Sequence, residues 1–379
     1  MQAEGQKELQ RLLNERASQP WETMTSLNVP RQKTDPRLLE NLAEALRASE
    51  RVKPAVKEKS TLELLEHYNL VIEDKLSNLG LLFVGRRQDR ARLGTAPLLQ
   101  AVKYDSHGHK INKWSWDDHS LSPPEIIDSV WQSIPDFQES YEIADGLRRR
   151  NIPAYDESVV RELLVNAFVH RPYNQGGEIF LNLHPDRLEL VNPGRLPMGV
   201  TPSNILHASR RRNNELARLF HDLGLMEREG SGFDLIYELL LLHGRATPQL
   251  EEGPDWLKVS VARQILDLPG MRLLARLNAE FGLSQRERIS LGLLSRADSL
   301  SAAELAEQLE LSSTAALPDW LGRLAELNII RRQQNQDQDQ PRYSLHPEIL
   351  SRFSNSSQNT ANNHQRPSLI KEPTHYYQT

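Results

Sequence analysis

Residues 161–173 read RELLVNAFVHRPY, and between the two arginines this stretch is apolar apart from three polar side chains. They are Glu162, Asn166 and His170, and positions four apart lie above one another on one side of an α-helix. Leu, Val, Ala and Phe occupy the other sides, so the pattern predicts a buried helix with one polar stripe. Because an unpaired buried amide or carboxylate is costly, the stripe must face a hydrogen-bond network or a bound ligand.

The composition of the 379-residue chain excludes several classes of protein. A net charge of −5 and a pI near 6.2 argue against a wholly basic nucleic-acid coat protein, although a local basic patch is still compatible with them. The absence of cysteine excludes a disulfide scaffold and any thiolate metal site. No signal segment opens the sequence, and its most apolar window, LIYELLLLHG near residue 240, is shorter than the roughly 20 residues that span a bilayer. We expect a soluble cytoplasmic protein without a membrane partner.

Helix caps and apolar periodicity predict an α/β module in residues 1–150. Asp35 followed by Pro36 marks the start of one helix, and Ser60 with Glu63 forms a capping box at the start of another. We expect helices at 35–49, 60–71 and 123–134, and strands at 79–85 and 98–105.

A second unit is expected in residues 151–265. After the polar-striped helix, EIFLNLH and RLELVN read as two strands around a turn, HPDR, and therefore as an antiparallel hairpin. A helix NNELARLFHDLGL, a buried helix after the glycine turn GSG, and a closing strand PDWLKVSVAR follow. The glycine turns NPG (192–194) and GSG (230–232) allow backbone to approach a ligand closely, and the helix that GSG opens favours phosphate.

Residues 275–350 show three helices followed by a hairpin, the pattern of a winged helix-turn-helix. Ser301 and Glu304 form a capping box, and Pro318 favours the start of the third helix at that point. DNA binding and protein docking both remain open for this unit, while residues 351–379 are polar, patternless and expected to be disordered. The side chains suited to contact DNA are Arg323, Arg331 and Arg332.

The polar stripe contains side-chain types that phosphoryl-transfer chemistry uses. Glu162 could polarise a water for attack on a phosphoryl group. Asn166 could coordinate Mg²⁺ through its side-chain oxygen. His170 either bonds Asn166 or a backbone carbonyl, or contacts a phosphate. A Glu and an Asn four residues apart are common in helices, so the order of the hairpin and the glycine turns after them adds the specificity.

Three segments together resemble the GHKL superfamily of ATPases, which includes gyrase, histidine kinases and MutL: LLVNAFVHRPY, LELVNPGRLPMGVTPSNIL and RRRNNELARLFHDLGLMEREGSGFDLI. More narrowly, they resemble bacterial and archaeal ATP-binding proteins that carry a Schlafen-type AlbA_2 domain, a GHKL-like ATPase domain and a winged helix, often labelled RecG-like or transcriptional regulators. The resemblance covers about residues 60–350. It implies an α/β multidomain protein with a GHKL-type sandwich at 151–265, which binds ATP and Mg²⁺.

The resemblance also implies roles for individual residues. Glu162 matches the water-activating glutamate, Asn166 the Mg²⁺ ligand and Gly194 the glycine of the first nucleotide box. Asn192 stands where the superfamily usually has the aspartate that holds the adenine amino group, which puts the base preference in question. Further cofactor contacts are expected at His170, Arg212, Asn213, Gly230, Ser231 and Gly232, with Arg210–Arg212 in the region that forms the nucleotide lid.

The expected function is that of an ATP-binding regulator in which the nucleotide state controls the winged helix. Whether ATP is hydrolysed stays open, and a motor helicase is excluded because the sequence has no G-x-x-x-x-G-K-[ST] phosphate loop. One alternative is a DNA-binding transcriptional regulator with an inactive pocket. Another is a scaffold subunit of a phage-defence assembly, in which a partner chain supplies the AlbA_2 domain that this sequence is expected to lack. We expect a homodimer, as in GHKL relatives.

Overall fold

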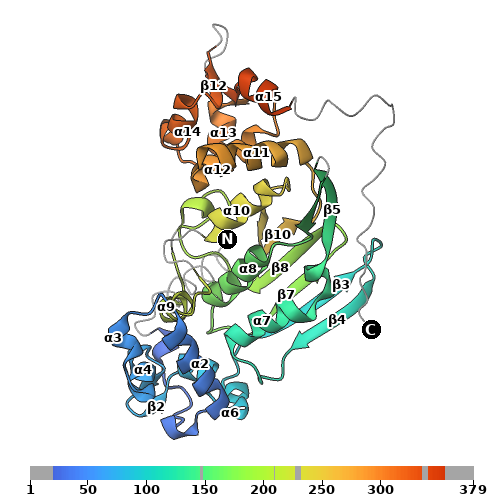
Figure 1. The fold of residues 1–379 in the computed structure, drawn as a ribbon. Coiled ribbons are helices and arrows are strands. Elements are labelled where there is room, and N and C mark those ends of the chain that lie inside the picture. The colour runs from blue at the N-terminus through green and yellow to red at the C-terminus, as the bar shows by residue number, and fades with distance from the viewer. Residues whose placement is uncertain (1–19, 146–147, 209, 227–231, 335–339, 355–379) are drawn as a thin grey trace, which may run out of the picture.

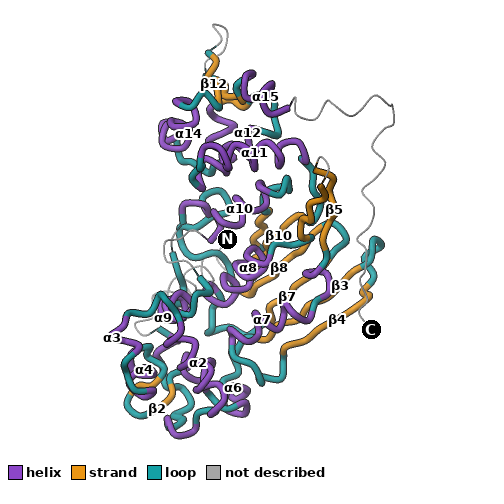
Figure 2. Tube along the Cα trace, viewed as in Figure 1, coloured by secondary structure: helices purple, strands orange, loops and turns teal. Residues whose placement is uncertain are grey.

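The chain builds a central β-sheet with helical regions on either side of it (Figures 1 and 2). The computed structural model describes residues 20–145, 148–208, 210–226, 232–334 and 340–354. In the view of Figure 1 the N-terminal helices (blue) lie below the level of the sheet and the C-terminal helices (orange to red) above it. Within these described ranges, no helix is long and apolar enough to cross a membrane.

The central sheet is mixed and has six strands in the order β4-β3-β7-β8-β10-β9. The pair β3–β7 is parallel, and all other neighbours are antiparallel. The hairpin predicted after the polar-striped helix is confirmed, with Leu181 opposite Leu190. Every second residue of both its strands is buried, as expected for a sheet covered by helices. The strands are β3 (Leu98–Tyr104), β4 (Lys110–Trp116), β7 (Glu178–Leu183), β8 (Arg187–Pro193), β9 (Gln249–Glu252) and β10 (Trp256–Ala262).

Helix α8 (Glu157–His170) carries the polar stripe and lies between α7 (Pro123–Ser133) and α10 (Gly232–Leu242) against the sheet (Figure 1). Asp156 begins the helix, because its carboxylate accepts a hydrogen bond from the backbone of Ser158. The prediction that this helix is buried nearly all round is confirmed: its apolar side chains are at most 2% exposed. Helix α8 is therefore part of the larger of two hydrophobic cores.

The N-terminal region is a set of short helices, and one sequence prediction about it is wrong. Residues 79–85 are predicted as a strand, but residues 79–84 belong to helix α5 and Gly85 is its C-cap. Ser77 caps the start of this helix by accepting a hydrogen bond from the backbone of Gly80. All of α5 is buried, and a fully apolar run has no periodicity that separates a helix from a strand. The predicted caps at Asp35 and Ser60 are confirmed. The elements are η1 (Trp21–Thr23), η2 (Arg31–Lys33), α2 (Pro36–Ala48), α3 (Pro54–Lys57), α4 (Thr61–His67), β1 (Val71–Ile72), β2 (Lys75–Leu76), α5 (Asn78–Val84) and α6 (Arg87–Arg92).

The boundary expected at residue 150 does not coincide with a break in the packing. Strands β3 and β4 precede it, yet they belong to the same sheet as β7 and β8. The larger core contains residues from Val29 to Val261. An additional ladder, β5 (Ser140–Asp145) with β6 (Arg148–Pro153), and the short helix η3 (Pro135–Gln138) occupy the segment around the expected boundary. Residues on both sides of 150 therefore form one packed unit, because the buried strand β3 finds its parallel neighbour in β7.

The C-terminal region has the second core and contains the three predicted helices followed by a hairpin. The capping box of Ser301 and Glu304 is confirmed, and Pro318 lies in the first turn of α14, as predicted. Residues 351–354, assigned to a disordered tail, end helix α15, and the rest of that tail lies outside the described residues. The elements are α11 (Leu268–Phe281), α12 (Gln285–Leu294), β11 (Leu300–Ser301), α13 (Ala302–Gln308), η5 (Thr314–Ala316), α14 (Leu317–Glu326), β12 (Ile330–Gln333), β13 (Arg342–Leu345) and α15 (Pro347–Ser354), with the sheet order β11-β13-β12.

Removing the ring of Phe168 tests the central position of α8. Phe168 has no exposed surface and packs edge-to-face with Phe220, at 6.2 Å between ring centroids. Phe168→Ala should lower the free energy of unfolding by about 3–5 kcal/mol, measured by denaturant titration with circular dichroism. Leu266→Ala, at a site that is 65% exposed, should change it by less than about 0.5 kcal/mol. Equal effects of the two substitutions would contradict the assignment.

Candidate functional site

A cleft opens beside the polar stripe of α8. Its walls are α8, strands β8 and β10, the start of α10, and a long loop between β8 and α9 (Asn214–Asp222). The cleft has roughly 920 Å³ of empty space, counting the part that is open to solvent. Its apolar lining includes Leu163, Ala167, Leu190, Leu196, Pro197, Val200, Ile205, Met226, Phe233, Leu257 and Val259.

Glu162 and Asn166 line this cleft and are bonded to each other. The amide nitrogen of Asn166 donates to Oε1 of Glu162 over 3.0 Å, and Glu162 is only 5% exposed. The amide oxygen of Asn166 accepts no hydrogen bond from any described residue. Helix α10 begins against this pair: a Cβ on Gly232 would lie 1.9 Å from Oε1 of Glu162, so a side chain at this position would displace the carboxylate. The stripe thus combines an internal hydrogen bond with an oxygen that remains available to a ligand.

Asn192 occupies the wall of the cleft on strand β8. Its side chain is 5% exposed, and its Oδ1 atom is buried without a hydrogen-bond partner among the described residues. A buried acceptor without a donor costs free energy, so the position is suited to a ligand that supplies an N–H group. Gly194 follows the same strand at a φ of +86°, and a Cβ there would lie 2.5 Å from the ring of Pro172. The turn therefore requires glycine.

His170 ends α8 and also lines the cleft. Its Nδ1 atom is buried and has no partner among the described residues. Burial lowers the pKa of His170 to about 4, and the charges of Arg212 and Arg211 act in the same direction. His170 is therefore a neutral imidazole near pH 7, able to donate or accept one hydrogen bond according to its tautomer.

Arg212 and Asn213 are absent from the lining of the cleft and instead cap the carboxyl end of α8. Arg212 donates to the carbonyl of His170 over 2.6 Å, and Asn213 donates to those of Val169 and Arg171 over 2.8 Å each. The last carbonyls of a helix lack intrahelical partners, so these two side chains hold the end of the polar stripe in place. Gly230 and Ser231, also expected at the site, lie outside the described residues.

The structure adds residues that the sequence reasoning did not assign to the site. Arg195, Arg210 and Arg211 line the cleft together with the apolar side chains of the same loop. Glu252 on β9 holds the start of this loop, since it accepts from the backbone of Leu196 over 2.8 Å and pairs with Arg195 over 3.1 Å. In the sequence, the three consecutive arginines at 210–212 indicated only that they lie in the region expected to form the nucleotide lid. Arg195 has no other arginine next to it and therefore gave no indication of a role at the site.

The residues expected to contact DNA lie in the C-terminal region, away from the cleft. Arg323 on α14 pairs with Glu287 over 2.8 Å and donates to the carbonyl of Phe281. Arg331 on β12 donates to the hydroxyl of Ser344, and its neighbour Arg332 is exposed. No cluster of three or more His, Asp or Glu side chains suited to a metal ion occurs in the part of the chain that the structure describes.

Comparison with known proteins supports an ATPase-like domain around the cleft. Residues 176–261 match the family model HATPase_c_4, described as "Putative ATP-dependent DNA helicase recG C-terminal". The crystal structure of the DIP2311 protein from Corynebacterium diphtheriae is similar in fold, with a TM-score of 0.68 and 21% identity over 89% of this chain and 68% of that one. No curated protein matches the chain significantly in sequence. The matched segment contains the strands, loop and helices on one side of the cleft, so ATP is the ligand that the similarity suggests.

The lowered pKa of His170 gives the stability of the protein a defined pH dependence. Between about pH 6.5 and pH 4 the unfolded chain binds a proton at His170 that the folded protein does not bind. The free energy of unfolding should therefore fall as the pH falls through this window, by up to about 1.4 kcal/mol per pH unit from this residue. His170→Gln should show a shallower dependence in denaturant titrations. His243, whose pKa burial also lowers to about 4, contributes equally to both proteins, so parallel curves would refute the assignment.

Proposed function

We propose that this protein is a nucleotide-dependent regulator that binds Mg²⁺-ATP in the cleft and uses it to control the C-terminal region. The observation that carries this proposal is Asn192, whose buried Oδ1 lacks a donor on the wall of a largely apolar cleft. The exocyclic amino group of adenine supplies such a donor, and the apolar side chains around it suit a flat base. Guanine presents a carbonyl oxygen at the corresponding position, so this acceptor favours adenine.

The polar residues of the cleft fit the phosphates and the metal ion. Arg195, Arg210 and Arg211 bring positive charge to the same cavity, and the amino end of α10 adds its dipole beside Gly232. Asn166 offers its amide oxygen to Mg²⁺, which retains waters and takes further oxygens from phosphates, so one protein ligand is sufficient. When bound, Mg²⁺ would offset the negative charge of the phosphate chain.

Glu162 is the residue that we propose as a base for slow hydrolysis. It is buried at the wall of the cleft, and its position is fixed by Asn166 on one side and by the close approach of Gly232 on the other. A carboxylate held in this way can accept a proton from a water near the phosphates. A turnover that is slow compared with that of a motor would suit a switch, in which the bound state must last.

We also propose that the C-terminal region is a winged helix-turn-helix. The order helix, strand, two helices and hairpin, from α12 to β13, supports this interpretation, as does the short β11 pairing with the hairpin. In this arrangement α14 is the recognition helix and β12–β13 the wing. Residues 268–354 contain ten arginines, no lysine and eleven aspartates and glutamates, so the unit has no excess of positive charge. Together with the pairing of Arg323, this balance favours a protein partner over DNA.

The loop that covers the nucleotide cleft also holds the C-terminal region. Glu310, in the turn after α13, accepts hydrogen bonds from the backbone of Leu206 and from the hydroxyl of Tyr237, each over 2.8 Å. The ring of His207 makes a 2.8 Å hydrogen bond with the carbonyl of Leu309 and packs edge-on against Trp320. The 3₁₀ helix η4 (Ile205–His207) thus lines the cleft through Ile205 and contacts α13 and α14 through its other residues.

We propose that this shared segment, η4, couples the nucleotide cleft to the C-terminal region. A nucleotide shifts the equilibrium between two arrangements only if it binds one of them more tightly. Phosphate contacts from Arg210 and Arg211 would favour one position of the loop, and the buried bonds of Glu310 would transmit that position to α13 and α14. The coupling free energy expected for such a link is about 1–3 kcal/mol.

Thermal unfolding with and without Mg²⁺-ATP tests the binding site. At about 100 times its dissociation constant, ATP should stabilise the folded protein by roughly 2.7 kcal/mol and raise the melting temperature. Asn166→Ala should lose most of this shift, because it removes the oxygen proposed for Mg²⁺. Asn182→Ala, on the other face of the sheet hairpin, is the matched control and should keep it. The proposal fails if ATP and ADP leave the wild-type melting temperature unchanged.

Hydrogen exchange of residues 302–326 tests the regulation separately. In the wild type, Mg²⁺-ATP should slow exchange in α13 and α14. Glu310→Gln removes the negative charge and leaves a single acceptor oxygen for the two groups that now donate to the carboxylate, so this protection should fall at least several-fold while ATP still raises the melting temperature. Glu307→Gln, an exposed position on α13, should behave like the wild type. Unchanged protection in Glu310→Gln would show that the loop does not carry the coupling.

A further inference from the structure

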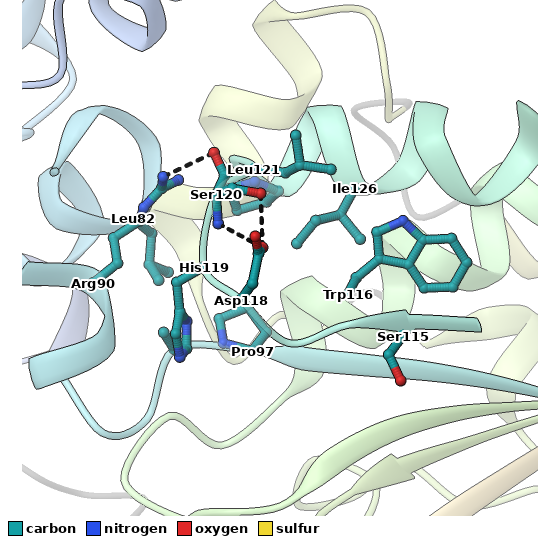
Figure 3. Close-up of a pocket in the computed structure, with 12 residues that line it drawn as sticks. Leu82, Arg90, Pro97, Ser115, Trp116, Asp118, His119, Ser120, Leu121 and Ile126 are labelled. Carbon is teal, nitrogen blue, oxygen red and sulfur yellow. Dashed lines mark hydrogen bonds between the residues drawn. The ribbon is translucent and has the colours of Figure 1, made fainter. Parts of the chain in front are cut away.

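A second cavity lies outside the nucleotide cleft, between the N-terminal helices and the edge strand β4 (Figure 3). Its walls are α5, α6, the segment before β3, the end of β4, and the loop that leads into α7. It encloses roughly 680 Å³, counting its open mouth, and it shares no lining residue with the cleft. The proposed nucleotide function therefore leaves this cavity unexplained.

Arg90 of α6 lines the cavity and is an unusual residue to find there. Its side chain is among the most buried of the charged groups, at 2% exposed. One nitrogen, Nη2, donates to the carbonyl of Ser120 over 3.1 Å, as Figure 3 shows, whereas Nε and Nη1 are buried without a partner among the described residues. A guanidinium stays charged at neutral pH, and a buried charge without a counter-ion is costly.

The carboxylates whose charge acts on Arg90 are all engaged elsewhere. Asp35 accepts a hydrogen bond from the first turn of α2. Glu125 forms an ion pair with Arg37 and caps the start of α7. Asp118 accepts two hydrogen bonds from Ser120 within its own loop. The protein therefore compensates the charge of Arg90 only in part and at a distance.

The opposite end of the cavity is apolar and rigid. Trp116 and Ile126 lie there, with Leu121 and Pro97 between them and Arg90 (Figure 3). The indole nitrogen of Trp116 donates to the hydroxyl of Ser129 over 2.8 Å, which fixes the orientation of the ring. His119 stands beside Arg90 at the polar end, in the left-handed backbone conformation. The cavity thus has a cationic end and an aromatic end, which fits a molecule with one charged and one apolar part.

We propose that this cavity is a binding site for a small organic monocarboxylate with an apolar body about the size of one aromatic ring. Its carboxylate would provide the counter-charge for Arg90, and its body would pack between Trp116 and Ile126. A monoanion is favoured over a phosphate dianion because Asp35, Glu125 and Asp118 lie close enough to repel a second negative charge.

Benzoate and its neutral isostere benzamide serve as probes, with affinities measured by saturation-transfer NMR titration of the full-length protein. Wild-type protein should bind benzoate at least about tenfold more tightly than benzamide, since only benzoate brings a counter-charge to Arg90. Inorganic phosphate should compete poorly. Equal affinity for benzoate and benzamide, or no saturable transfer to benzoate, would overturn the proposal, and competition by phosphate at similar concentration would identify a phosphate site instead.

Two variants locate the binding. Arg90→Gln should abolish the preference for benzoate, and its melting temperature without ligand should stay the same or rise because an uncompensated charge is removed. Arg87→Gln is the control: it removes the charge of an exposed arginine of the same helix that does not line the cavity, and it should keep the preference. If Arg90→Gln binds benzoate as the wild type does, the proposal is refuted. If Arg90→Gln does not fold, the comparison of benzoate with benzamide on the wild type still decides the question.

Discussion

The polar stripe of α8 is the constraint on which the rest of the structure depends. A helix packed against a sheet and between two other helices has to bury a carboxylate, an amide and an imidazole along one line. The protein satisfies only part of this requirement internally, through the hydrogen bond between Glu162 and Asn166. The oxygen of Asn166, the Nδ1 of His170 and the Oδ1 of Asn192 are left facing the same cleft without protein donors or acceptors among the described residues. Two of these atoms, the Nδ1 of His170 and the Oδ1 of Asn192, are buried, and leaving them unpaired costs free energy, which agrees with the proposal of a ligand in this cleft.

The same stripe explains why residues far from the ligand matter to it. The carboxyl end of α8 has carbonyls without intrahelical partners, and Arg212 and Asn213 satisfy them from the segment that follows the loop over the cleft. Arg212 also donates to the carbonyl of Arg195 at the start of that loop. The two ends of the loop are therefore tied to each other and to the carboxyl end of α8. Arg212 and Asn213, expected from the sequence to contact the cofactor, instead bond the backbone at the end of α8 and at the start of the loop.

Local signals in the sequence predicted local structure well. The caps at Asp35, Ser60 and Ser301 depend on neighbouring residues only, and so does the hairpin of β7 and β8. The error at residues 79–85 and the position of the expected boundary at residue 150 have another origin, namely tertiary burial. Helix α5 is apolar on every side because it is enclosed, and β3 joins the later strands through a parallel pairing with β7 that no local pattern encodes. The same distinction applies to the candidate sites. Helical periodicity in the sequence predicted Glu162 and Asn166. Arg195 and the cavity around Arg90 were not predicted, because their surroundings come from segments that are distant in the sequence.

The position of Glu310 decides what kind of motion the loop can make. Its carboxylate is buried and accepts hydrogen bonds from the backbone of Leu206 and the hydroxyl of Tyr237, and its backbone is in the left-handed region, which is uncommon for residues other than glycine. Burial raises the pKa of Glu310, so these hydrogen bonds offset a real cost of desolvation. A loop that moved alone would break them and leave a carboxylate buried without donors. The proposed regulation therefore predicts that α13 and α14 move together with the loop, as one two-state element.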